Sequence, residues 1–101
     1  MTKTEDKLNP TVYEYWFNKL IENENRCIPT LANAYCALLG IEMPADNSKR
    51  DTLIKRMGAI YRDSRQDPFE VLIGINDMRF KSIEGNPLNY LTVMLRKRRG
   101  E

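Results

Sequence analysis

The stretch "DPFEVLIGINDMRF", residues 67–80, is apolar on two opposite sides when it is drawn as a helix. At about 100° per residue, its large apolar side chains form two stripes, with Val71, Leu72, Ile75 and Met78 on one side and Phe69, Ile73 and Phe80 on the other. A narrow polar strip remains, which we expect to be solvated and which carries Glu70, Asp77 and Lys81. A helix with two apolar sides is typical of the buried centre of a bundle. The stretch therefore predicts a small all-α bundle of about five helices around this fourth, central helix.

Five helix starts of one kind divide the chain. Asn, Asp, Ser, Thr or Pro stands before each apolar run, at Asn9–Pro10, Pro29–Thr30, Asp46–Asn47–Ser48, Asp67–Pro68 and Asn86–Pro87. A capping side chain accepts a hydrogen bond from a backbone N–H that has no partner in the first turn, and proline there loses no useful donor. Asp67 with Glu70, and Ser48 with Asp51, also have the form of a capping box. Strand evidence is poor, because no run alternates with period two.

The helical spacing also predicts the core. The first helix has a wide apolar side that includes Phe17 and Ile21, and the second ends at Gly40, where a left-handed residue is needed. We expect seven side chains to be buried because each lies at the centre of an apolar side: Trp16, Leu38, Leu53, Met57, Leu72, Ile75 and Leu91.

Length and composition are those of one ordinary globular domain, with 101 residues, 42% hydrophobic and 30% charged. No stretch approaches the roughly 20 apolar residues that a membrane span needs. The polar start resembles no targeting peptide, and we expect residues 1–8 to be flexible. We therefore expect a cytoplasmic protein without membrane contact, in which Cys27 and Cys36 are reduced thiols. The sequence does not indicate an oligomeric state.

Several residue patterns that enzymes use are missing. The chain has no histidine, the usual general base and the commonest metal ligand. Two cysteines without a histidine partner do not make a zinc site, and the five glycines form no phosphate-binding loop. We therefore expect no catalysis, no metal or other cofactor, and no small-molecule substrate.

Positive charge is concentrated in the second half of the chain. Residues 1–46 hold four basic and seven acidic side chains, whereas residues 47–101 hold twelve basic and seven acidic. The third helix, 48–65, carries Lys49, Arg50, Lys55, Arg56, Arg62 and Arg65. A basic tail, 96–101, carries Arg96, Lys97, Arg98 and Arg99. Such polarity attracts polyanions to one end of a molecule and repels them from the other.

The basic tail admits three interpretations. Basic side chains near a helix C-terminus offset the macrodipole, so the tail can be a solvated helix end. Pairs four residues apart, Asp51 with Lys55 and Asp77 with Lys81, would likewise be ordinary stabilising contacts. Four charges around the whole circumference exceed what a helix end needs, however, which favours contact with nucleic acid or with an acidic protein partner.

Segment 30–62 invites comparison with a helix-turn-helix. In that motif the turn takes about three or four residues. Here residues 41–47 separate the helices, and Asp46 stands where an apolar residue is wanted. A looser variant remains open, in which a recognition helix begins with Asn47, Ser48, Lys49, Arg50 and Thr52.

The last helix, "NPLNYLTVMLRKRR" at residues 86–99, resembles the closing helical segments of replication accessory proteins from phages and plasmids. The matching residues are Asn86, Pro87, Tyr90, Leu91 and the basic run 96–99. The resemblance is confined to this helix. It implies an accessory role near DNA or a replisome component, such as helicase loading or single-strand binding, and it implies no catalysis.

Tyr90 is a candidate for direct contact with nucleic acid. It lies away from the inner arc of the fifth helix, on one stripe with Val93 and Lys97. An exposed aromatic ring beside a lysine can stack on a base while the cation pairs with phosphate. The alternative is that Tyr90 packs against another helix with its hydroxyl in water.

Two hypotheses follow. The first is a nucleic-acid accessory protein, and the second is a small phage-type interaction or inhibitor protein that binds a host protein. The candidate binding residues are the same for both: Lys49, Arg50, Lys55, Arg56, Arg62, Tyr90, Arg96, Lys97, Arg98 and Arg99.

Overall fold

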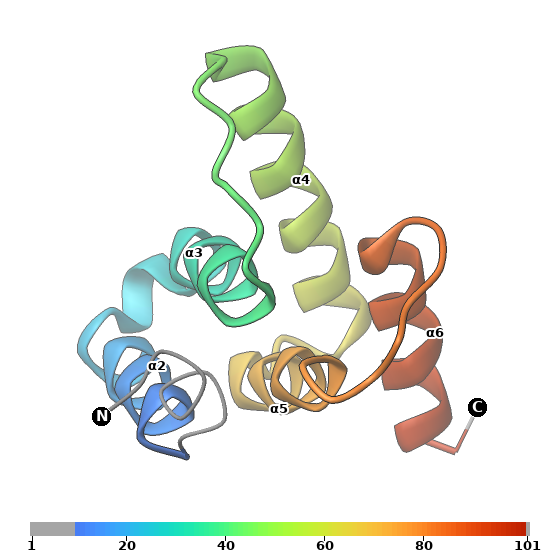
Figure 1. Ribbon diagram of the computed structural model, residues 1–101. Helices are drawn as coiled ribbons and strands as arrows, with labels where there is room; N and C mark the ends of the chain where they lie inside the picture. Colours follow the sequence, from blue (N-terminus) through green and yellow to red (C-terminus); the bar gives the residue numbers. More distant parts are fainter. Residues whose placement is uncertain (1–9, 101) are drawn as a thin grey trace.

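The computed structural model describes residues 10–100, which form a bundle of α-helices (Figure 1). The helices are α2 (Pro10–Glu22), α3 (Cys27–Leu39), α4 (Asn47–Asp63), α5 (Pro68–Met78) and α6 (Pro87–Arg98), with a 3₁₀ turn η1 (Glu24–Arg26) before α3. No strand occurs within residues 10–100. The predicted all-α bundle of five helices is confirmed.

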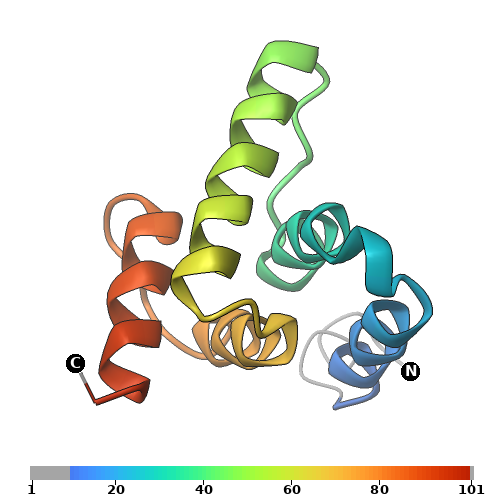
Figure 2. The same cartoon turned by 180° about the vertical axis from the view of Figure 1, so that it is seen from behind.

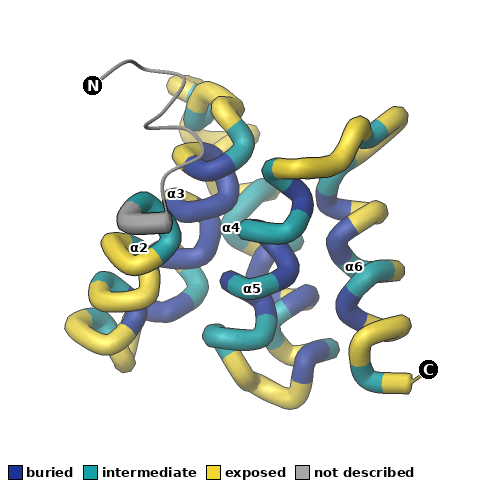
Figure 3. The backbone as a smooth tube through the Cα atoms, turned by 60° about the horizontal axis from the view of Figure 1, so that its bottom comes forward, coloured by how far each residue is buried: buried dark blue, intermediate teal, exposed yellow. Residues whose placement is uncertain are grey.

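Helix α5 is the centre of the bundle, as the two apolar sides of its sequence predict. It contacts α2, α3, α4 and α6. Figures 1 and 2 show α5 between the α2–α3 pair and α6, while α4 rises from it and extends beyond the other helices. In Figure 3, the buried residues lie along α5 and along the sides of α3, α4 and α6 that face α5. The position of α5 therefore decides where every other helix packs.

Three helices start at side-chain caps. The carboxylate of Asp67 accepts hydrogen bonds from the backbone N–H groups of Phe69 and Glu70, and Asn86 accepts one from Leu88. At α4 the cap is Asp46, which accepts from the Ser48 N–H, so the predicted capping box of Ser48 with Asp51 is wrong. Asn9 lies outside the described residues.

Helix α3 begins earlier than the sequence suggests. It starts at Cys27, directly after η1, and its N-cap residue Arg26 makes no side-chain capping bond. Pro29 is therefore the third helical residue rather than the first. Its missing N–H costs nothing there, because the first-turn donors have no partner within the helix.

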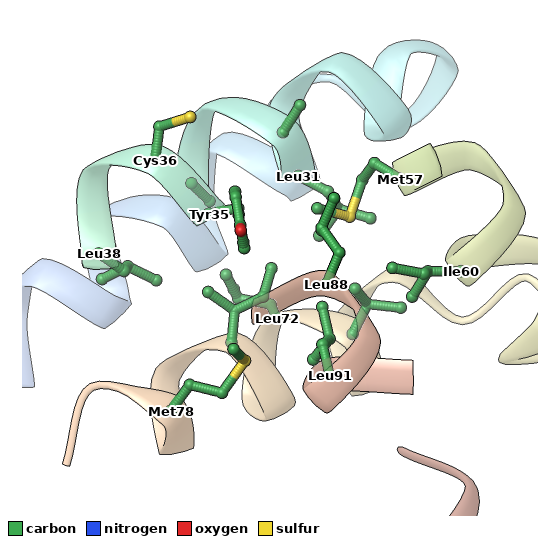
Figure 4. Packing of buried hydrophobic residues seen from close by; sticks show 14 of the residues in the cluster. Leu31, Tyr35, Cys36, Leu38, Met57, Ile60, Leu72, Met78, Leu88 and Leu91 are labelled. Carbon is green, nitrogen blue, oxygen red and sulfur yellow. The ribbon is translucent and has the colours of Figure 1, made fainter. Parts of the chain in front are cut away.

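The core contains five of the seven side chains predicted to be buried, and Figure 4 shows four of them, Leu38, Met57, Leu72 and Leu91, among their neighbours. The five are Leu38, Met57, Leu72, Ile75 and Leu91. Trp16 is only half-buried, because α2 lies at the outside of the bundle and turns this residue partly toward solvent beside Tyr15. Leu53 is also half-buried, because it directly follows residues 45–52, all of which are exposed.

Three aromatic or apolar side chains are more exposed than their stripes predict. Phe80 is 60% exposed because α5 ends at Met78, so the helical spacing does not continue to it. Ile21 is 53% exposed and Phe17 is 37% exposed, since the apolar side of α2 is wider than the surface it packs on. Phe17 still contacts Phe69 of α5, with ring centroids 5.0 Å apart.

Removing a side chain from α5 should destabilise the whole bundle. Ile75 is fully buried, so we expect Ile75→Ala to reduce the free energy of unfolding by about 2–5 kcal/mol. Val93 on α6 is 52% exposed, and Val93→Ala should change it by less than about 0.5 kcal/mol. Urea unfolding followed by circular dichroism measures both variants. Equal stability of the two variants would contradict a central α5.

Gly40 ends α3 as predicted, and its backbone tests the turn. It has φ 67° and ψ 31°, in the left-handed region, and its N–H bonds to the Cys36 carbonyl. A Cβ atom added at Gly40 would meet no other atom within 4 Å, so a side chain would be opposed by backbone strain alone. We expect Gly40→Val to lower stability by about 1–3 kcal/mol, because β-branched residues are strained at positive φ. Gly40→Asn is the matched control, since asparagine tolerates this conformation. Thermal unfolding of both variants measures the effect, and Gly40→Asn should lose less stability than Gly40→Val.

Candidate nucleic-acid interface

The first turns of α4 project from the bundle. All residues from 45 to 52 are exposed, including the predicted binding residues Lys49 and Arg50. Arg50 donates through Nε to the Pro44 carbonyl at 3.2 Å, so its side chain folds back along the α3–α4 connection. The projecting end therefore offers a helix surface that no other described element covers (Figure 1).

The remaining basic residues of α4 lie on its outer side and beside α6. At about 100° per residue, Lys49 and Arg56 share one stripe, and Lys55 and Arg62 share the next. Arg56 donates through Nη2 to Asn89 Oδ1 of α6 at 2.7 Å, which places Arg56 at the contact between these helices. We call the basic residues of α4, together with the adjoining Asn89 of α6, the α4–α6 face: Lys49, Arg50, Lys55, Arg56, Arg62 and Asn89. It covers more than one side of α4, because a Cβ atom added at Gly58 would lie 3.4 Å from Arg62 Nη1 and 3.6 Å from Ile28 Cδ1 of α3.

The cations of α4 are not neutralised within the fold. Among residues 10–100, no carboxylate lies within ion-pair distance of Lys49, Arg50, Lys55, Arg56 or Arg62. The predicted pair of Asp51 with Lys55 is therefore wrong. Both side chains are exposed at the outer side of α4, where an ion pair gains little over hydration.

The arginines at the end of α6 are in a different situation, because each contacts a carboxylate of α4 or α5. Arg98 donates through Nε to Glu70 at 2.7 Å and through Nη1 to Asp77 at 3.4 Å. Asp63 accepts from Arg96 at 3.2 Å and from Arg99 at 3.3 Å. The Arg99 side chain is only 12% exposed.

These contacts correct the interpretation of the polar strip on α5. Glu70 and Asp77, predicted to be solvated, are instead the counter-ions of Arg98. The predicted pair of Asp77 with Lys81 is wrong as well, because α5 ends before Lys81 and the four-residue spacing is lost. Arg98 and Arg99 therefore hold the end of α6 against α5 and α4. Residues 96–98 are the last turn of this helix rather than a separate tail.

Charge pairing changes the acidity of these groups. The hydrogen bond from Arg96, with further support from Arg99, lowers the pKa of the Asp63 carboxyl below its usual value. The hydrogen bond to Glu70 raises the pKa of the Arg98 guanidinium. Both changes stabilise the charged forms at the end of α6.

Tyr90 and Lys97 lie on one side of α6, as predicted. Tyr90 is 36% exposed, and with Val93, Met94 and Lys97 it lines a shallow hollow of about 200 Å³. Lys81, from the segment after α5, completes this hollow. Lys81 could not be recognised as a binding residue from the sequence, since no spacing along the chain relates it to Tyr90. Lys97 forms no ion pair with any of residues 10–100.

The structure thus divides the ten candidate residues into three groups. Lys49, Arg50, Lys55, Arg56 and Arg62 are on α4. Arg96, Arg98 and Arg99 contact carboxylates at the end of α6, and Tyr90 and Lys97 line the hollow on its other side. A connection of seven residues, 40–46, separates α3 from α4, so the pair is not a conventional helix-turn-helix.

Two further findings concern other kinds of site. Residues 10–100 contain no group of three or more Cys, Asp or Glu side chains that could hold a metal ion. None of the helices in the same range combines the length and the apolar character needed to cross a bilayer.

Comparison of the chain with protein-family models, with curated proteins and with solved structures gives no match.

The shared carboxylate Asp63 should make stability depend on pH in acid. Its folded-state pKa is lowered, so its contribution is complete above the unfolded pKa, about 3.9, and is lost as the pH falls through the folded pKa. We expect Asp63→Asn to be less stable at pH 7 and to lose less stability than the wild type below about pH 4. Urea midpoints between neutral and acidic pH measure this. Asp51→Asn, at an exposed residue without an ion pair, is the control that should keep the wild-type pH dependence.

Proposed function

We propose that this protein is a non-catalytic accessory protein that contacts nucleic acid through the α4–α6 face. One observation carries the proposal. Five cations lie on one helix without a carboxylate partner among residues 10–100, while three arginines at the C-terminal end of α6 are paired. Arginine and lysine groups without counter-ions are the groups that phosphate can neutralise, with release of the ions condensed on the nucleic acid.

The shape of α4 suits this role. A helix with its side chains is about 10–12 Å in diameter, and the major groove of DNA is about 12 Å wide. Because residues 45–52 are exposed all round, this end of α4 can enter a groove without a clash from the bundle. Asn47, Ser48 and Thr52 would then face base edges, while Lys55 and Arg62 would lie near phosphates.

Tyr90 and Lys97 supply a second contact in this proposal. The hollow that they line with Lys81 has one aromatic ring and two cations, the combination that binds single strands by stacking and phosphate pairing. Arg96, Arg98 and Arg99 would reach nucleic acid only by leaving their carboxylates. We therefore assign the main contact to α4 rather than to the end of α6.

The cellular role that we infer is in the replication of a mobile element, such as a phage or plasmid. It is supported by the resemblance of residues 86–99 to the closing helices of replication accessory proteins. A cytoplasmic location agrees with it, because Cys27 and Cys36 are free thiols, as is usual in a reducing compartment.

Binding to oligonucleotides at several salt concentrations tests the proposal. Fluorescence anisotropy with labelled single and double strands should show log K falling with log salt, with a slope of about −0.7 to −0.9 per phosphate contact. The variant Lys55→Gln with Arg62→Gln should weaken binding and flatten this slope. Tyr90→Ala should weaken binding to single strands more than to duplex if the ring stacks.

A control variant with the same change in charge separates a specific face from general attraction. Lys19→Gln with Arg26→Gln removes two charges from α2 and η1, at the other end of the bundle from α6 (Figure 1). We expect it to keep most of the affinity and the full slope. Equal losses from both double variants would remove the α4–α6 face from the proposal. No affinity for either oligonucleotide at low salt would favour the alternative, an interaction protein that binds a host protein.

A further inference from the structure

Arg79, at the end of α5, has a guanidinium group that is only partly satisfied. Its Nη1 donates to Asn76 Oδ1 at 2.9 Å. Its Nε and Nη2 are buried and find no hydrogen-bond partner, and no carboxylate of residues 10–100 pairs with it. Burial lowers the pKa of this guanidinium, yet an arginine stays charged in proteins. The fold therefore holds a buried cation with two unused donors, which is costly.

The two unused donors lie on the same edge of the guanidinium plane. That edge can donate two parallel hydrogen bonds to one carboxylate or phosphate group, the strongest and most directional contact that arginine makes. The chemistry that would satisfy Arg79 is therefore a planar or tetrahedral anion with two oxygens side by side.

The surroundings of Arg79 favour a carboxylate on an apolar carrier. Arg79 lines a hollow of about 270 Å³ between the end of α3 and the end of α5. Most of its other walls are apolar, including Leu38, Ile41, Met78 and Ile83. A phosphate group of nucleic acid, with its hydrated sugar, would gain nothing from such walls, whereas leucine-like side chains would.

The hollow also belongs to a longer surface. Lys81 lines both this hollow and the one formed by Tyr90, Val93 and Lys97. Three exposed apolar residues lie in or beside these hollows: Ile41 is 37% exposed, Phe80 60% and Val93 52%. An elongated surface of apolar groups with cations at intervals matches an extended or helical peptide better than a compact small molecule.

We propose that this surface docks a segment of a protein partner in which an Asp or Glu side chain lies between apolar side chains, with the carboxylate paired to Arg79 and an apolar neighbour in the hollow. Charge complementarity selects this occupant, because both charged groups that line the hollow are cations. No residue of α4 lines the Arg79 hollow, so pairing at Arg79 is tested separately from the α4 contact with nucleic acid. Lys81 also lines the Tyr90 hollow, so a bound peptide would compete there with a single strand.

Access to the free edge requires a side-chain rotation, since Nε and Nη2 are closed to solvent. The Phe80 ring lies beside the guanidinium, 5.4 Å from its carbon atom to the ring centroid. With 60% of the residue exposed, little packing opposes a turn of this ring. Binding should therefore be visible at both Arg79 and Phe80.

The first experiment uses hexanoate, the smallest probe with a carboxylate and an apolar tail, and hexanamide as its uncharged match. In a ¹H–¹⁵N and methyl NMR titration, hexanoate should shift the Arg79 Nε–H signal and the Ile41 and Ile83 methyl signals. Hexanamide should bind at least about tenfold more weakly than hexanoate, because it cannot form the charge-assisted pair with Arg79. No shift at Arg79, or equal shifts with both probes, would overturn the proposal.

The variant Arg79→Met distinguishes a binding residue from a structural one. An apolar side chain of similar length removes a buried unpaired charge, so the melting temperature should stay the same or rise. The preference for hexanoate over hexanamide should disappear, and oligonucleotide affinity should remain. A large drop in melting temperature together with unchanged hexanoate binding would show that Arg79 serves the fold and not a ligand.

A second experiment tests whether the occupant is a peptide. Short random peptides displayed on a surface are selected on the wild-type protein and then screened against Arg79→Met. Enrichment of sequences with Asp or Glu beside Leu, Ile or Phe, which fail on the variant, supports a protein partner. If hexanoate binds but the selected peptides carry no carboxylate, the site serves a small carboxylic acid and the docking proposal is wrong.

Discussion

The close approach of α6 to α5 at Gly74 is the contact on which most of the molecular surface depends. A Cβ atom at this position would lie 2.8 Å from Leu95 Cδ2 and 3.0 Å from Leu91 Cδ1, so any larger residue would displace the ends of these two leucines. Because Leu91 and Leu95 are both buried, α6 has no freedom to shift away. That position brings Arg98 against α5 and brings Arg96 and Arg99 against the end of α4.

The same electrostatic groups consequently have two different uses. At the end of α6, arginine charge holds helices together, since one carboxylate, Asp63, accepts from two arginines. On α4, charge of the same sign has no carboxylate partner among residues 10–100 and is available to a polyanion. Net charge, which is +2 for the whole chain, does not separate these two roles. Only the relative position of helices far apart in the sequence does so.

The sequence was sufficient for what is local and insufficient for what is not. Two apolar stripes correctly predicted that α5 is central, and Asp67, Asn86 and Gly40 correctly marked helix ends, because capping and left-handed turns depend on neighbouring residues alone. The partners of Arg98 could not be predicted, since periodicity within one helix does not say which polar strip lies opposite. Leu53 was wrongly predicted to be buried for a similar reason, because its exposure depends on how far α4 extends beyond α3. Lys81 joined the Tyr90 hollow through tertiary packing only.

The uncovered end of α4 also has a consequence for local stability. Residues 45–52 bury no side chain, so they are held by the helix itself, by the Asp46 cap and by the hydrogen bond from Arg50 to the Pro44 carbonyl. Such a segment opens without unfolding the core, and its amide hydrogens should exchange faster than those around Met57 in the same helix. Lys49 and Arg50 lie within it, which makes it a favourable cleavage point for trypsin within residues 10–100. Occupation of this end by any large ligand would then be recorded as resistance to digestion.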